Sequence, residues 1–338
     1  MKLTPIQMKD SLEIVLKAGL VPFIQGSPGI GKSDIVRSVA NKYNLKVIDI
    51  RLSQCDPTEI NGFPFHDGKR MDYLPPKQFP LQELDSIPSG YNGWLIFLDE
   101  FNSASIATQA AAYKLILDRM IGVYSIHKNA AIVCAGNTEN DNAIVNDMST
   151  AMQSRLIHLE LKTNIKEWID WANQNNIDNR IKAFLEFRPD LLHKFDSNHN
   201  DKTFATPRTW AFASKLIQGK ENISEILPIL YGTVSKGVTI EFNAFCNQYM
   251  NLPKIQDILA SPDEISIDDN NMGVLYALAY MISCYFDETT IDKLLIFVKR
   301  LPPEFSVVCM KAAIRRNKEL LQHASIKEWI SEFAQEVM

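Results

Sequence analysis

Short apolar runs alternate with amphipathic helical patterns over the first half of the chain. Two runs, at residues 94–98 and 130–135, are apolar almost throughout, which is typical of buried central strands. Strands that alternate with helices favour an α/β core, in which helices sandwich a parallel sheet. The predicted strands are 20–25, 46–52, 94–98, 130–135 and 156–161, and the predicted helices between them include 33–43 and 104–117.

The second half has a different pattern, because strand signals fade after about Thr163 and helical periodicity dominates. Helices are predicted at residues 165–173, 179–187 and 206–217. The most apolar stretch, 273–286, predicts a buried helix, since it is shorter than the ~20 residues that span a bilayer. We therefore expect an all-helical second half with no membrane segment.

Residues 26–33, GSPGIGKS, match the phosphate-loop pattern G-x-x-x-x-G-K-[ST] directly after a predicted strand and at the start of a predicted helix. Glycines let successive backbone N–H groups turn inward around phosphate oxygens, and the helix N-terminus adds a positive dipole. Lys32 is expected to reach the β- and γ-phosphates and the Ser33 hydroxyl to ligate Mg²⁺, so the predicted cofactors are ATP and Mg²⁺. The predicted nucleotide-binding residues here are Gly26, Ser27, Pro28, Gly29, Ile30, Gly31, Lys32, Ser33 and Asp34.

Polar residues close two later strands. The run WLIFLDE ends in Asp99, which is expected to hold Mg²⁺ together with Ser33, and in Glu100, which is expected to polarise an attacking water as a general base. The strand AAIVCAG is followed by Asn137, which could position that water or sense the γ-phosphate. A turn-forming asparagine after Gly136 explains the same residue equally well.

Two hairpins are predicted around these strands. Asp67-Gly68 lies between aromatic and apolar residues within 61–73, which indicates a hairpin before the acidic strand. This segment is either an ordinary surface hairpin or a functional insertion. A second hairpin is predicted at 120–127, before the strand that leads to Asn137.

The motifs GSPGIGKS, WLIFLDE and CAGN, followed by an arginine after a helix, resemble in this order the AAA+ ATPases. The two hairpins make the resemblance closer to the MoxR branch, whose members carry one hairpin insertion before the acidic strand and another before the asparagine strand. The resemblance covers roughly residues 3–216. It implies an α/β nucleotide-binding core at 1–162 and a helical lid at 163–240, while residues 241–338 form a helical extension that matches no known module.

The resemblance also implies roles for two arginines. Arg155, just before the last predicted core strand, resembles the arginine finger that one subunit places on its neighbour's γ-phosphate. A helix-end arginine that complements the helix dipole explains it too, and Arg119 is a rival finger. Arg208 follows Thr206 and Pro207 in the opening turn of a predicted helix, and it resembles the sensor arginine by which the lid contacts nucleotide.

Charge and cysteine content narrow the class of protein. The 338 residues contain 35 Lys and Arg against 40 Asp and Glu, a net charge of −5 that does not favour wrapping nucleic acid through overall charge. Five cysteines without CxxC spacing are typical of reduced thiols in a cytosolic protein and predict no zinc site. No targeting segment is visible, so a cytoplasmic protein is expected. The basic residues Lys311, Arg315, Arg316 and Lys318 fall at helical spacings and are interpreted as a solvated helix face, with an acidic partner or nucleic acid as the alternative.

These observations and the resemblance together predict a Mg²⁺-dependent ATPase of the MoxR type. Such a protein would form a homo-oligomer, by resemblance a hexameric ring, and would remodel a protein partner, which could carry a von Willebrand factor A domain. Two alternatives stay open. One is a nucleic-acid-directed AAA+ ATPase of the loader, transposition or restriction type, and the other is a nucleotide-gated switch that hydrolyses ATP slowly.

Overall fold

A computed structural model describes residues 1–138, 146–195, 202–268 and 270–333. The chain divides into two compact units, which we call unit 1 (Met1–Asn164) and unit 2 (from Ile165 onwards). Each unit has its own hydrophobic clusters, and each is described by itself below.

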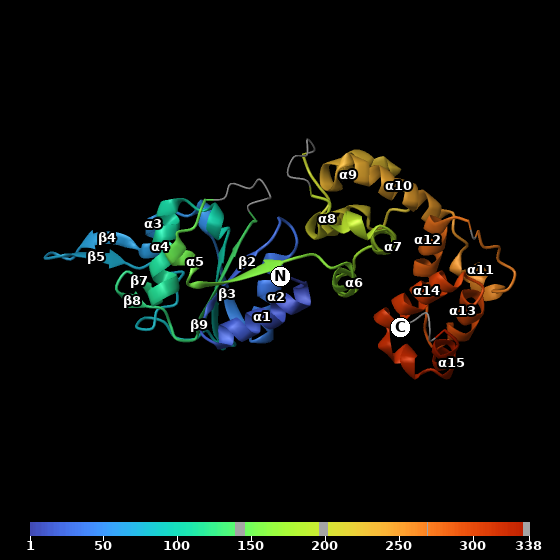
Figure 1. Ribbon diagram of the computed structural model, residues 1–338, viewed down its shortest axis with the longest axis horizontal. Helices are drawn as coiled ribbons and strands as arrows, with labels where there is room; N and C mark the ends of the chain where they lie inside the picture. Colours follow the sequence, from blue (N-terminus) through green and yellow to red (C-terminus); the bar gives the residue numbers. More distant parts are fainter. Residues whose placement is uncertain (139–145, 196–201, 269, 334–338) are drawn as a thin grey trace. The chain divides into compact units, whose positions relative to one another are not determined.

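Unit 1 is built on a six-stranded sheet in the order β1-β10-β2-β9-β6-β3, with every neighbouring pair parallel (Figure 1). All five predicted strands are confirmed. The two-residue edge strand β1 was not predicted, because so short a segment carries no periodicity; it pairs with the end of β10. The strands are β1 Lys2–Leu3, β2 Val21–Gln25, β3 Leu45–Arg51, β6 Gly93–Asp99, β9 Ala130–Gly136 and β10 Leu156–Leu161.

Helices cover both faces of this sheet, which explains why its central strands are apolar throughout. Along β6, Leu95 and Phe97 belong to the cluster that includes side chains of α1 and α2, whereas Ile96 and Leu98 belong to the cluster that includes α4. This alternation follows from the two-residue repeat of a strand. The helices of unit 1 are α1 Pro5–Lys17, α2 Lys32–Lys42, α3 Pro57–Asn61, α4 Ile106–Asp118 and α5 Thr150–Gln153.

Both predicted hairpins are present. Strands β4 (Phe63–His66) and β5 (Met71–Leu74) pair antiparallel and extend away from the sheet of unit 1 (Figure 1). Their turn is closed by Asp67, whose carboxylate accepts hydrogen bonds from two backbone N–H groups, and by Gly68 with φ 99°. The second hairpin joins two two-residue strands, β7 Met120–Ile121 and β8 Tyr124–Ser125.

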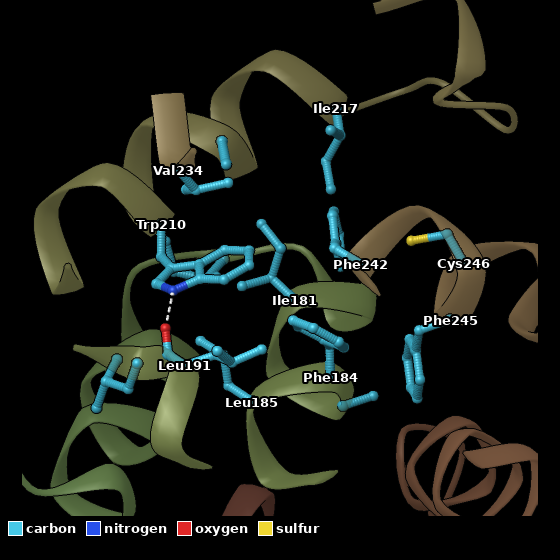
Figure 2. Packing of buried hydrophobic residues seen from close by; sticks show 14 of the residues in the cluster. Ile181, Phe184, Leu185, Leu191, Trp210, Ile217, Val234, Phe242, Phe245 and Cys246 are labelled. Carbon is cyan, nitrogen blue, oxygen red and sulfur yellow. Dashed lines mark hydrogen bonds between the residues drawn. The ribbon is translucent and has the colours of Figure 1, made fainter. Parts of the chain in front are cut away.

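The regular elements of unit 2 are helices throughout its described residues, as predicted. Around α7 and α8, the rings of Phe184, Trp210 and Phe242 pack together, and the Trp210 indole donates to the Leu191 carbonyl oxygen at 2.8 Å (Figure 2). The helices are α6 Ile165–Gln174, α7 Asn179–Phe187, α8 Pro207–Ile217, α9 Leu227–Val234, α10 Lys236–Met250, α11 Ile255–Ala260, α12 Met272–Ser283, α13 Ile291–Val298, α14 Pro303–Arg316 and α15 Ala324–Glu332.

Helix α12 contributes to two hydrophobic clusters, which accounts for its nearly uniform apolar sequence. Its Ala277 and Tyr280 pack in the cluster around Trp210, and Leu278 and Ile282 pack in the cluster formed with α13, α14 and α15. The lid boundary expected after residue 240 falls inside α10, so the division into lid and extension stays a proposal. No helix among the described residues combines the length and apolar character that crossing a bilayer requires.

The interpretation of the C-terminal basic cluster as a solvated helix face is wrong for two of its members. Arg315 pairs with Asp170 at 3.3 Å and with Glu186 at 3.2 Å. Arg316 donates to the Asn179 side-chain oxygen at 2.9 Å and lies over the Tyr280 ring. Helix α14 ends at Arg316, so these contacts join its last turn to α6, α7 and α12.

Candidate nucleotide site

The phosphate loop connects β2 to α2 in the predicted position. Gly29 and Gly31 have φ values of 76° and 99°, in the left-handed region that favours glycine. A Cβ atom on Gly26 would lie 2.5 Å from the Ile30 Cδ1 atom and 3.3 Å from the Leu161 carbonyl oxygen, so a side chain here would require the Ile30 side chain to shift. The loop therefore uses its glycines for both backbone conformation and close packing, as a phosphate-binding loop requires.

Lys32 connects three parts of this loop region. Its ammonium group donates to the Gly26 carbonyl oxygen, to the Ser27 carbonyl oxygen at 3.2 Å and to the Asn137 side-chain oxygen at 3.1 Å. Asn137 follows β9, which lies beside β2 in the sheet. The predicted phosphate-binding lysine and the predicted sensor asparagine thus meet directly.

Ser33 and Asp99 also meet, as the prediction of a shared metal site requires. The Ser33 hydroxyl donates to one Asp99 carboxylate oxygen at 3.1 Å, and the other oxygen accepts the Glu100 backbone N–H at 2.8 Å. A hydroxyl and a carboxylate are ligands that fit Mg²⁺, which in nucleotide sites takes its remaining ligands from phosphates and water. This oxygen pair suits such an incomplete shell. Among the described residues, no group of three or more His, Cys, Asp or Glu side chains could hold a metal by itself.

Glu100 has an unusual backbone conformation for a residue with a side chain, with φ 55° in the left-handed region. Its carboxylate accepts a hydrogen bond from the Ser53 hydroxyl. Ser53 lies in the short 3-10 helix η1 (Leu52–Gln54) that follows β3, the sheet neighbour of β6. The sequence analysis missed Ser53, because a single hydroxyl residue after a strand has no distinctive pattern.

A second missed residue is Asn102, in the 3-10 helix η2 (Phe101–Ser103) directly after Glu100. Its side chain is 3% exposed and bonds both backbone groups of Asn137. The site thus combines the carboxyl ends of β2, β9, β6 and β3, where parallel strands bring their following residues to one edge.

The two finger candidates differ in their surroundings. Arg119 is half-buried in the left-handed conformation at the end of α4 and donates to the Ala130 and His127 carbonyl oxygens, while burial lowers the pKa of its guanidinium. Arg155 is exposed beyond α5, donates to the Ala151 carbonyl oxygen at 2.7 Å and lies 5.5 Å from the centre of the Tyr113 ring. Both arginines hydrogen-bond within unit 1, and Arg155 stays the predicted finger with Arg119 as its rival.

The predicted sensor arginine, Arg208, belongs to unit 2. It is exposed in the first turn of α8, between Thr206 and Thr209, which form the capping box. The helix start matches the sequence prediction. The contact between Arg208 and nucleotide stays a prediction.

Comparison with known proteins gives a distant structural likeness. No family model and no curated protein matches the chain. Among 489 similar solved chains, a mutant of RuvB from Thermotoga maritima is 16% identical, with 85% of this chain and 84% of that chain covered and a TM-score of 0.38. NtrX from Brucella abortus, in complex with ADP, is 14% identical, with 97% of this chain and 68% of that chain covered and a TM-score of 0.40.

Proposed function

We propose that the protein is a Mg²⁺-dependent ATPase of the AAA+ class, similar to the MoxR branch, which uses ATP hydrolysis in a ring to remodel a protein partner. The observation that carries this proposal is the meeting of Lys32 with Asn137 and of Ser33 with Asp99 at one edge of a parallel sheet. These residues come from three separate strand ends, and each has the chemistry that phosphoryl transfer needs.

Each residue of the site has a distinct part in this proposal. The loop N–H groups and the Lys32 ammonium bind the phosphates, and Ser33 with Asp99 would hold Mg²⁺, which neutralises charge that develops on the transferred phosphoryl group. Glu100 accepts a proton from the attacking water once its carboxylate leaves Ser53. Asn137 orients the same water through its amide.

The proposed ring gives Arg155 its part. An exposed arginine can reach the γ-phosphate of a neighbouring subunit, where its positive charge would complete the site only on assembly. Arg208 would contact nucleotide from the lid, so that loss of the γ-phosphate releases the lid and moves a bound partner. Six subunits and a partner with a von Willebrand factor A domain are further parts of the proposal, and both come from the resemblance.

The β4–β5 hairpin supports a protein partner. Phe63, Met71 and Leu74 are 66%, 72% and 64% exposed, and Phe65 and Tyr73 are exposed beside them. Exposed apolar side chains gathered on one ribbon are typical of an interaction surface. We propose that this hairpin binds an extended apolar segment of polypeptide, because each strand of a two-stranded ribbon also has an open edge for backbone pairing.

Charges on the hairpin and in unit 2 argue against the nucleic-acid alternative. On the hairpin, Lys69 and Arg70 are balanced by Asp67 and Asp72, so it offers no surplus positive charge to phosphates. The C-terminal arginines are bonded within unit 2, as described above. A DNA-binding assay at several salt concentrations tests this point, and a steep salt dependence would contradict the proposal.

Shared catalysis is tested by the Mg²⁺-ATPase rate per protomer over a range of protein concentrations. We expect the rate to rise steeply with concentration and to fall by about 10³-fold in Arg155→Ala, with nucleotide binding retained. Arg37→Ala is the matched control, because this arginine is a surface residue of unit 1 that pairs with Asp49. A rate that is independent of concentration and of Arg155 would contradict a ring-completed site.

Glu100→Gln separates turnover from the slow-switch alternative. The amide keeps the shape of the side chain but cannot accept a proton, so hydrolysis should fall by about 10²-fold or more while ATP stays bound. Quenched-flow hydrolysis and retention of labelled ATP measure both effects. An unchanged hydrolysis rate would show that Glu100 is not the base.

A further inference from the structure

Asn102 occupies a position that the roles proposed above leave unexplained. Its side chain is 3% exposed and lies in the turn between the acidic strand β6 and helix α4. The Asn102 amide nitrogen donates to the Asn137 carbonyl oxygen at 2.8 Å, and the Asn102 amide oxygen accepts from the Asn137 backbone N–H at 3.1 Å. The Asn102 side chain therefore forms hydrogen bonds with both the N–H and the C=O group of Asn137, the predicted sensor residue.

This double contact continues the sheet beyond its last paired residues. The ladder between β6 and β9 has its last register pair at Leu98 and Cys134, and β9 ends at Gly136. Asn137 therefore lies past the backbone ladder, and the Asn102 amide supplies the donor and acceptor that a neighbouring strand would otherwise provide.

Gly136 shows how closely Asn102 approaches. A Cβ atom at Gly136 would lie 2.1 Å from the Asn102 side-chain oxygen, a distance that no side chain tolerates. This glycine has no positive φ, so its small size is needed for the approach of Asn102 and of the nearby Phe23 ring. The Asn102 backbone carbonyl oxygen also accepts from the Asn146 N–H at 2.7 Å.

We propose that Asn102 is a positioning residue for ATP hydrolysis, and this inference rests on the function proposed above. By holding the Asn137 backbone, Asn102 sets where the Asn137 amide lies, and that amide meets the Lys32 ammonium at 3.1 Å. Because Asn102 follows Glu100 by two residues, it also ties the proposed base and the proposed sensor to one short turn. Asn102 itself touches neither nucleotide nor water in this mechanism.

The test compares Asn102→Ala, Asn137→Ala and the double variant. We expect each single variant to lower kcat by about 10–100-fold, with the dissociation constant for a fluorescent ADP changed less than about twofold. The double variant should be no slower than Asn137→Ala, because Asn102 acts through Asn137. Losses that multiply in the double variant, or an unchanged kcat in Asn102→Ala, would overturn the inference.

Gln109→Ala is the matched control for a purely structural role. Gln109 is 6% exposed in α4, and its amide donates to the Ala104 carbonyl oxygen at 3.1 Å, on the same turn but away from Asn137. This variant should lower the melting temperature without changing kcat. An equal loss of kcat in Gln109→Ala would show that Asn102 acts only through general stability of the turn.

A readout without catalysis separates this inference from the proposed function. Hydrogen exchange at the Asn137 backbone N–H should be slow in the wild type and much faster in Asn102→Ala. Gly136→Ala is a second variant that disrupts the same contact. A wild type that binds no nucleotide and hydrolyses no ATP would overturn the proposed function. Unchanged exchange at Asn137 in both variants, or unchanged kcat beside an active wild type, would overturn the positioning role alone.

Discussion

Units 1 and 2 use similar polar residues for different purposes. In unit 1, polar groups lie at the ends of parallel strands: Asp99, at the end of β6, bonds Ser33 of α2, and Asn137, just after β9, bonds Lys32. In unit 2, Arg180 is 9% exposed and all five of its N–H donors are used by Asp178 and by the carbonyl oxygens of Ile217, Lys220 and Glu221.

The difference shows that the surroundings of a charge decide its role. The partners of Arg180 all lie within its own unit. Its planar guanidinium joins the start of α7 to the end of α8 through hydrogen bonds. Three oxygens that the Lys32 ammonium contacts, those of Gly26, Ser27 and Asn137, are neutral, and an anionic phosphate can displace neutral oxygens at a gain in Coulomb energy. The Lys32 ammonium is therefore placed to bind an anionic ligand, whereas the Arg180 guanidinium stabilises the packing within unit 2.

The largest effect is expected from Arg180→Met. The change removes five side-chain hydrogen bonds and the ion pair with Asp178, whose carboxylate then keeps the backbone N–H of residue 180. The free energy of unfolding of unit 2 should therefore fall by about 3–5 kcal/mol. Urea unfolding followed by tryptophan fluorescence measures it, since every tryptophan except Trp94 lies in unit 2. Lys311→Met, on an exposed position of α14, is the control and should change little.

Lys32→Ala tests the other side of the comparison. Loss of the ammonium should weaken nucleotide binding by about 100-fold or more and leave the unfolding of unit 2 unchanged. Titration with a fluorescent nucleotide measures the affinity. Lys42→Ala removes a lysine from the same helix that pairs with Glu13 instead, and it should bind nucleotide normally. Equal nucleotide affinities in the two variants would show that Lys32 does not contribute to nucleotide binding.

Lys182 sharpens the comparison, because it is a buried cation whose ammonium group donates to a neutral partner, the Asn173 side-chain oxygen, at 3.1 Å. Burial, together with the nearby Arg316, lowers the pKa of its ammonium from 10.5 to about 8. Between about pH 8 and about pH 10.5 the unfolded chain binds more protons at this residue than the folded chain does, so Lys182 makes stability rise with pH in this window. Below it, the full cost of the buried charge is present.

We therefore expect Lys182→Met to have a larger free energy of unfolding than the wild type, with the greatest difference near neutral pH. Its advantage in the free energy of unfolding should shrink by about 3 kcal/mol as the pH rises through the window. Urea unfolding of both proteins at several pH values measures the difference. Curves that stay parallel would show that Lys182 titrates normally in the folded state.

The smallest effect on stability is expected at the β4–β5 hairpin. Phe63→Ser changes a side chain that is 66% exposed, so the free energy of unfolding should stay within about 0.5 kcal/mol of the wild type. Basal ATPase activity should also be unchanged. Crosslinking to an extended apolar peptide should decrease, whereas Lys69→Ala at the turn should leave it unaltered. Equal crosslinking in both variants would contradict the proposed docking surface.

Sequence patterns predicted most of unit 1 because its signals are local. The strand periods, the phosphate loop and the acidic pair are each contained within a few consecutive residues, and strand-end geometry then brings Asp99 and Asn137 towards Lys32. Ser53 and Asn102 were missed because a single polar residue after a strand has no distinctive pattern. Their roles depend on contacts with Glu100 and Asn137, which are 47 and 35 positions away respectively.

In unit 2 the sequence by itself determined that helices form and which of their faces are apolar, since a repeat of 3.6 residues is visible in one segment at a time. Only the tertiary structure decided what the charged residues do. Arg315 and Glu186 lie 129 positions apart, and no local pattern links them. A helix period places a charge on one face, but whether that face meets water or an opposite charge depends on which distant helix packs against it.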